Sequence, residues 1–97
     1  MDQPITEAEK KKIYDELAEY LISGLEKAEI FEEEAAHSAD FVLKRLDTIA
    51  TRRQLLEFLA QLSSKWDIYR PAYEKVKKEE LLQQVQSELS QLQIQTK

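Results

Sequence analysis

The stretch TRRQLLEFLAQLSSKW, residues 51–66, decides the fold class. Thr51 is followed by Gln54 at the third position, which is the pattern of a capping box. In this motif the threonine hydroxyl accepts a hydrogen bond from a backbone N–H, and the amide reaches back to the start of the helix. Apolar side chains then recur on one broad helical face, namely Leu55, Leu56, Phe58, Leu59, Leu62 and Trp66. The pattern predicts a helix over 52–65 that is the most buried element of the protein.

The rest of the chain also favours helices, since one glycine and two prolines are too few for β-hairpins or phosphate-binding loops. A second capping box, Thr6 with Glu9, predicts a helix over 7–27. Its core stripe follows at spacings of three and four, namely Ile13, Leu17, Leu21, Leu25 and Ala28. Further helices are expected over 32–49 and, starting near Pro71, over 71–92. Because 97 residues support only one core, we expect a small all-α, four-helix domain over 1–97, with 93–97 as a frayed tail.

The boundary between the first two helices needs an argument, because periodicity alone also allows an unbroken helix over 7–49. The apolar positions stay in phase across the junction, namely Phe31, Ala35, Ala39, Val42, Leu46 and Ile49. Helices average about 11–12 residues, however, and one of over forty would leave little chain to cover it. We therefore expect a helical hairpin. Glu32, Glu33 and Glu34 then form a first turn, where the positive end of the helix dipole favours carboxylates.

Glu34 and His37 have the Glu-x-x-His spacing found in di-iron helical bundles. Projection at about 100° per residue places both side chains on the side of the helix away from its core stripe, whereas a bundle metal site lies inside. The chain also has only one histidine, so a symmetric dimer would have to supply the remaining ligands. We expect no metal and no other cofactor. A carboxylate and histidine site assembled by dimerisation stays open as an alternative.

A second, weaker apolar strip on the same helix includes Ile30 and Phe41, and the segment 66–76 adds Trp66, Tyr69 and Tyr73. The favoured interpretation is that these side chains pack inside the protein, where aromatic residues contribute most. The alternative is that they form a binding site for a protein partner.

Charge is distributed unevenly along the chain, whose formal net charge is −5. Residues 1–40 carry twelve acidic and four basic side chains, against seven and ten in residues 41–97. The two parts can therefore neutralise each other within one molecule. The aromatic and basic side chains of residues 65–75 resemble a platform for single-stranded nucleic acid, but an acidic protein repels phosphates, so nucleic acid is only a third hypothesis.

Several functional classes lack support in this sequence. The chain has no cysteine and no apolar run near the ~18 residues that a membrane span requires. Its single histidine has no Gly-bounded oxyanion loop beside it, so we do not expect an enzyme. A cytoplasmic location and a soluble protein are expected.

The helix over 71–92 has two faces that point in different directions. Tyr69, Tyr73 and Val76 cluster on one side, whereas a second apolar stripe projects roughly 150° away. That stripe consists of Leu82, Val85, Leu89 and Leu92. We expect the first half of the helix to pack on its own domain and the second half to extend beyond it and bind a protein partner or a second copy in a homodimer. The alternative is a bent helix that folds the stripe back onto the domain.

Overall fold

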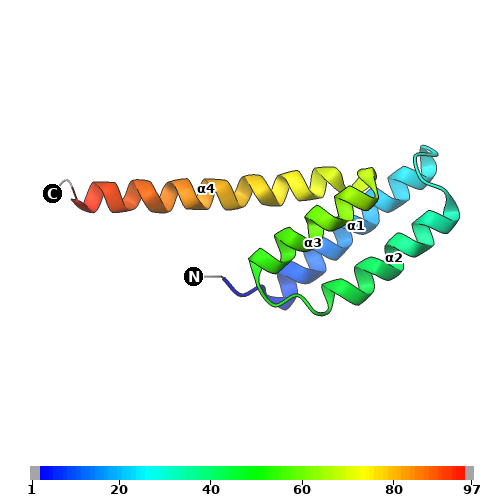
Figure 1. The fold of residues 1–97 in the computed structure, drawn as a ribbon, viewed down its shortest axis with the longest axis horizontal. Coiled ribbons are helices and arrows are strands. Elements are labelled where there is room, and N and C mark those ends of the chain that lie inside the picture. Colours follow the sequence, from blue (N-terminus) through cyan, green and yellow to red (C-terminus); the bar gives the residue numbers. More distant parts are fainter. Residues whose placement is uncertain (1–2, 96–97) are drawn as a thin grey trace.

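The computed structural model describes residues 3–95 and, within them, the side chains of residues 3–91. It contains four α-helices: α1 (Glu7–Glu26), α2 (Glu32–Leu46), α3 (Arg52–Lys65) and α4 (Arg70–Gln95). A short 3-10 turn, η1 (Asp67–Tyr69), leads into α4. The predicted small all-α architecture with four helices is confirmed (Figure 1).

Both predicted capping boxes are present. The Thr6 hydroxyl accepts from the Glu9 N–H at 3.1 Å, and the Glu9 carboxylate accepts from the Thr6 N–H at 3.3 Å. Thr51 and Gln54 repeat the arrangement at 3.2 and 3.3 Å. Each box satisfies backbone donors that a helix start leaves without an intrahelical partner, so α1 and α3 begin where the sequence predicts.

The hairpin between α1 and α2 is also confirmed, but α1 ends in a way that the sequence does not signal. Ala28 adopts a left-handed conformation with φ of 57°. Its N–H donates to the Leu25 carbonyl, and the Glu29 N–H donates to the Gly24 carbonyl at 2.8 Å. This pattern is a Schellman motif, which closes a helix and usually has glycine at the left-handed position. The expectation that Ala28 belongs to the core stripe is wrong, because this residue is exposed in the turn.

The second helix ends at Leu46, three residues before the predicted boundary at 49. The Thr48 and Ile49 N–H groups donate to carbonyls three residues earlier, and the Thr48 hydroxyl also donates to the Arg45 carbonyl at 2.8 Å. Threonine side chains that bond the backbone in this way compete with the helical ladder. Ile49 nevertheless remains buried in the core.

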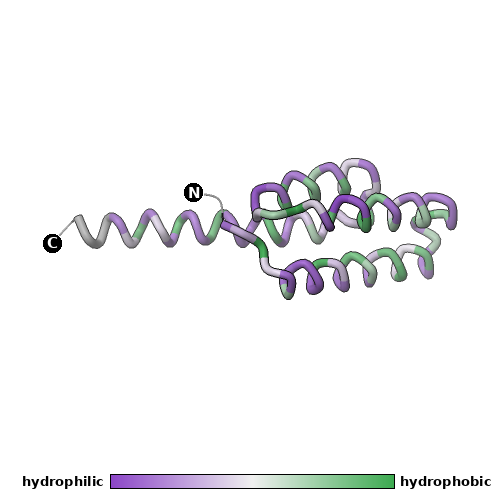
Figure 2. The backbone as a smooth tube through the Cα atoms, turned by 90° about the horizontal axis from the view of Figure 1, so that it is seen from below, coloured by the Kyte–Doolittle hydropathy of each residue, from purple (hydrophilic) through white to green (hydrophobic). Residues whose placement is uncertain are grey.

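The core lies between α1, α2, α3, η1 and the first half of α4. Its centre is α3, where Leu55, Leu59 and Leu62 have no exposed surface, in agreement with the prediction that this helix is the most buried. Phe58 of α3 and Ile49 of the loop before it are also buried, and the other elements contribute the remaining buried apolar side chains, namely Leu17, Ala35, Val42, Leu46, Tyr69, Ala72 and Val76. Figure 2 shows apolar positions alternating with polar ones along each helix of this body.

The last helix has two parts with different surroundings. Its first half packs on the body, where the Lys75 ammonium lies 2.8 Å from the Glu16 carboxylate of α1. Its second half, here called the arm (residues 81–95), continues past the other helices in both views (Figures 1 and 2). All side chains of residues 81–91 are exposed. Within the described part of the chain, no helix is both long enough and apolar enough to cross a membrane.

Candidate interaction surfaces

The arm carries a stripe of exposed apolar side chains. Leu82, Val85 and Leu89 are 51, 44 and 54% exposed, and the neighbouring Leu81 is 60% exposed. The predicted fourth member, Leu92, lies outside the residues whose side chains are described. A helix in water rarely presents such a stripe without a partner, because contact between water and each of these apolar side chains is unfavourable.

This stripe faces away from the body. At about 100° per residue, the three side chains lie roughly 120–180° around α4 from Val76, which is buried in the core. The side of the arm nearer the body is polar, where Gln83, Gln84 and Ser87 border a hollow at the arm's base together with Arg53 of α3. A partner could therefore contact the apolar stripe without displacing α4 from its own domain.

The base of the arm is held by Arg52, at the start of α3, whose side chain is only 14% exposed. Its guanidinium lies 2.7 Å from Glu9 of α1 and 3.6 Å from Glu79 of α4, and its Nε donates to Glu80. The hydrogen bond with Glu80, followed by the nearby carboxylate charges, raises the pKa of Arg52 and keeps it charged. Sequence patterns did not predict this cluster, since its members are distant in the chain.

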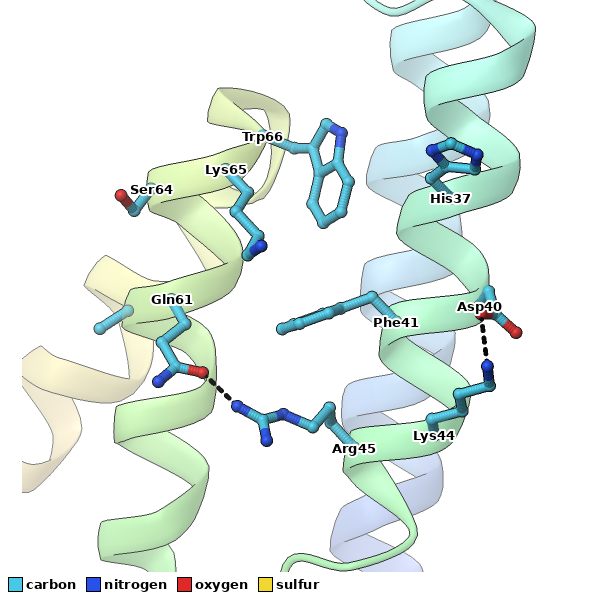
Figure 3. Close-up of a pocket in the computed structure, with 10 residues that line it drawn as sticks. His37, Asp40, Phe41, Lys44, Arg45, Gln61, Ser64, Lys65 and Trp66 are labelled. Atoms are coloured by element: carbon cyan, nitrogen blue, oxygen red, sulfur yellow. Dashed lines mark hydrogen bonds and ion pairs between the residues drawn. The ribbon is translucent and has the colours of Figure 1, made fainter.

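A second surface lies between α2 and α3 and is centred on Phe41 (Figure 3). The Phe41 ring stacks on Phe58 of α3 with centroids 5.8 Å apart, and Trp66 meets it edge-on at the same distance. Arg45 and Lys65 each place their charge 5.4 Å from the ring centroid. Such cation–π contacts shield the aromatic ring from water.

Polar contacts fix the rim of this aromatic groove. Arg45 donates to the Gln61 side chain at 2.5 Å, and the Lys44 ammonium lies 3.0 Å from the Asp40 carboxylate (Figure 3). Because Phe41 is half-buried among protein groups, it does not offer the open ring face that a base-stacking platform requires.

The other aromatic residues singled out from the sequence are mostly part of the body. Tyr69 is 1% exposed, and its hydroxyl lies 2.7 Å from that of Ser38, which in turn donates to the Ala35 carbonyl. Burial raises the pKa of Tyr69, because ionisation would place a charge in the core. Ile30, Phe41, Trp66 and Tyr73 are half-buried. The packing interpretation therefore holds for Tyr69, which has no surface to offer a partner in this fold.

The histidine and glutamate considered as metal ligands lie apart from any cluster of ligands. His37 is exposed, and the Glu34 carboxylate accepts a hydrogen bond from the Trp66 indole N–H at 2.8 Å. Among residues 3–95, no group of three or more His, Cys, Asp or Glu side chains is arranged to hold a metal ion. Within one copy of the chain, this hydrogen bond gives Glu34 a structural role, because it positions the Trp66 side chain.

Sequence periodicity missed a third set of surface residues. Leu25 was expected in the core but is 39% exposed, and Tyr14, Ile22 and Leu43 are 41, 56 and 55% exposed. The signal was present in the helical projection, in which Tyr14, Leu25 and Ile22 lie roughly 60–140° around α1 from the buried Leu17.

Comparison with models of known protein families, with curated proteins and with solved structures gives no match.

Proposed function

We propose that the protein is a small protein–protein interaction module that self-associates into a homodimer through its arm. The observation that carries this proposal is the exposed stripe of Leu82, Val85 and Leu89 on the face of α4 opposite the body. The role is one of binding rather than catalysis. A cytoplasmic location belongs to the proposal, and the sequence, which has no cysteine, is compatible with it.

Charge favours a second copy of the chain as the partner. The protein has a net charge of −5, but Glu88 is the only charged residue among residues 81–95. Two copies that meet through this segment therefore bring few like charges together, whereas contact between their acidic N-terminal halves would be opposed by repulsion.

The energy available from the stripe is modest. Complete burial of a leucine or valine side chain contributes about 1.5–3 kcal/mol, and these side chains are already about half covered by their own helix. Six such side chains in a dimer would contribute roughly 5–9 kcal/mol, which the cost of association, about 4–15 kcal/mol, largely offsets. The stripe therefore needs an apolar partner surface larger than itself to give a stable dimer.

Light scattering coupled to size exclusion tests the proposal. The full chain should be a dimer at about 10–100 µM, and Val85→Gln with Leu89→Gln should make it monomeric, because glutamine keeps the helix but removes the apolar contact. The matched control, Gln84→Ala with Gln91→Ala, changes the polar face of the same segment and should remain dimeric.

The same variants can refute the proposal. A full chain that is monomeric at the highest of these concentrations would overturn self-association. If Val85→Gln with Leu89→Gln, or deletion after Glu80, which keeps the carboxylates that pair with Arg52, unfolds the protein as judged by circular dichroism, the stripe belongs to the core of a single chain.

A further inference from the structure

A small apolar hollow of about 50 Å³, here called the groove, lies between α1 and α2. Its walls include Tyr14 and Leu21 of α1 and Ala39 and Leu43 of α2, and Leu17 and Val42 form its floor. Tyr14 and Leu43 are 41 and 55% exposed, although both border side chains of the core. The residues that line this groove carry no charge at neutral pH, in a protein of which 34% of the residues are charged.

The other sides of the body differ from this groove. The first half of α4 packs on α3 and reaches α1 through the pair of Lys75 and Glu16, so it covers the side between those two helices. Between α2 and α3 a larger hollow of about 920 Å³ remains around Phe41 and Trp66, but charged side chains such as Asp40, Lys44 and Arg45 line it. The groove between α1 and α2 is therefore the more apolar of these two surfaces.

We propose that this groove receives the arm of a second copy of the chain, so that two protomers exchange arms about a two-fold axis. The inference rests on the proposed self-association and names the surface that the arm contacts. Among the side chains of residues 3–91, six of the nine exposed large apolar residues belong to these two regions. They are Tyr14 and Leu43 in the groove and Leu81, Leu82, Val85 and Leu89 on the arm.

The dimensions of the two surfaces match. From Tyr14 to Leu21 the wall of the groove rises about 10 Å along α1, and the apolar stripe from Leu82 to Leu89 also rises about 10 Å. Alanines at positions 18 and 39 line the groove, and side chains this small let a helix approach closely, so that its leucines can insert between the ridges of α1 and α2.

An exchange of arms also accounts better for the exposed apolar surface than a contact between two arms. Pairing of arms buries one stripe per chain and leaves the groove in water, whereas exchange buries both the stripe and the groove of each chain. Exchange therefore buries more apolar area toward the roughly 800 Å² per partner of a standard interface, and the two-fold symmetry closes the assembly at a dimer. Within one chain, the arm cannot turn back into its own groove, since residues 77–95 contain no glycine or proline and form one helix.

Substitutions in the groove distinguish exchange from arm pairing. Tyr14→Gln with Leu43→Gln should raise the dimer dissociation constant at least about tenfold. The same effect is expected of Val85→Gln with Leu89→Gln. The matched control is Phe31→Gln, which removes an 81% exposed apolar side chain outside both surfaces and should leave dimerisation unchanged. Analytical ultracentrifugation measures all of them, with circular dichroism as the check of folding.

Cysteine cross-linking gives a second test that does not depend on weakening the protein, because the natural chain has no cysteine. A Leu43→Cys chain is mixed with a chain carrying Leu82→Cys, Val85→Cys or Leu89→Cys and oxidised with glutathione disulfide. Exchange predicts a disulfide-linked dimer of two different chains for at least one arm position. If none forms, or if the groove variant dimerises as tightly as the unmodified chain, exchange is wrong and the self-association proposal stands. A full chain that is monomeric would contradict both the exchange of arms and the self-association.

Discussion

The guanidinium of Arg52 and the carboxylate of Glu9 lie 2.7 Å apart, which joins the start of α3 to the first turn of α1. The same side chain reaches Glu80 and Glu79 of α4. One arginine therefore connects three helices at the point where the arm leaves the body. Its planar group can serve several carboxylates at once, which the single ammonium of lysine cannot do in the same geometry.

Replacement of this arginine should destabilise the protein. Arg52→Met removes hydrogen bonds to charged groups and leaves three carboxylates close together, so we expect a loss of about 2 kcal/mol in the free energy of unfolding. Arg52→Lys should give an intermediate loss. Urea denaturation measures both losses. The control is Arg53→Met, at an adjacent and exposed position, which should change the free energy of unfolding by less than about 0.5 kcal/mol. Equal midpoints for Arg52→Met and the unmodified chain would show that the cluster contributes nothing to stability.

The buried hydroxyl of Tyr69 should make stability depend on alkaline pH. Burial raises the pKa of this tyrosine above its ordinary value of 10.0, so its contribution is complete below that pH and is lost as the pH rises toward the folded-state pKa. Tyr69→Phe should cost about 1 kcal/mol at neutral pH, because it removes the hydrogen bond with Ser38.

The test compares urea midpoints of the unmodified protein and Tyr69→Phe between about pH 8 and pH 11. Between pH 10 and the folded-state pKa the unmodified protein should lose up to roughly 1.4 kcal/mol per pH unit relative to the variant, so the difference between them should shrink. The other tyrosines and the lysines are common to both proteins and cancel. A difference that stays constant over this range would contradict the burial argument.

The cap of α3 should be worth about 1 kcal/mol. Thr51→Ala removes the hydroxyl that accepts from the Gln54 N–H at 3.2 Å and leaves that donor without its partner. Thr51→Ser keeps the hydroxyl and serves as the control. An unchanged denaturant midpoint for Thr51→Ala would show that the capping box does not stabilise the start of this helix.

Local rules predicted the features of this fold that depend on neighbouring residues. The starts of α1 and α3 follow from side chains three residues apart, and the opposed faces of α4 follow from helical geometry, as the burial of Val76 and the exposure of Leu82 show. The end of α1 was not predictable in the same way, since the left-handed residue is an alanine and gives no signature in the sequence.

Surfaces made by distant residues could not be derived from periodicity. The contact of Phe41 with Phe58 and Trp66 depends on how α2 crosses α3, and so does the position of Arg45 over the ring. Periodicity likewise assigned Leu25 to the core because it lies in phase with Leu17. Leu25 lies about 80° around the helix from Leu17, at the edge of the core stripe, and is 39% exposed.

The exposed histidine should have no role in metal binding. His37→Ala is expected to leave metal content, fold and assembly unchanged, because the ring lies on the outer side of α2 and Glu34 is engaged by Trp66. Elemental analysis of protein purified without an affinity tag, before and after substitution, measures this. A stoichiometric transition metal that disappears in His37→Ala would support the alternative of a site assembled between two copies.

The turn after α1 allows a prediction whose sign differs between two similar substitutions. Ala28 has a φ of 57°, a conformation that costs a residue with a side chain roughly 1–2 kcal/mol and costs glycine almost nothing. Ala28→Gly should therefore stabilise the protein by about 0.5–1 kcal/mol, after allowance for the greater freedom of glycine in the unfolded chain. This corresponds to a rise of roughly 2–8 °C in the melting temperature.

The matched control is Ala36→Gly, which makes the same change at an exposed position inside α2. There the alanine is helical, so glycine should destabilise by about 1 kcal/mol. Thermal unfolding followed by circular dichroism compares the two variants with the unmodified chain. Opposite shifts are expected because the two alanines differ in backbone conformation and not in exposure. If both substitutions lower the melting temperature, the Schellman motif does not close α1 in solution, and the boundary between α1 and α2 must be held by other contacts.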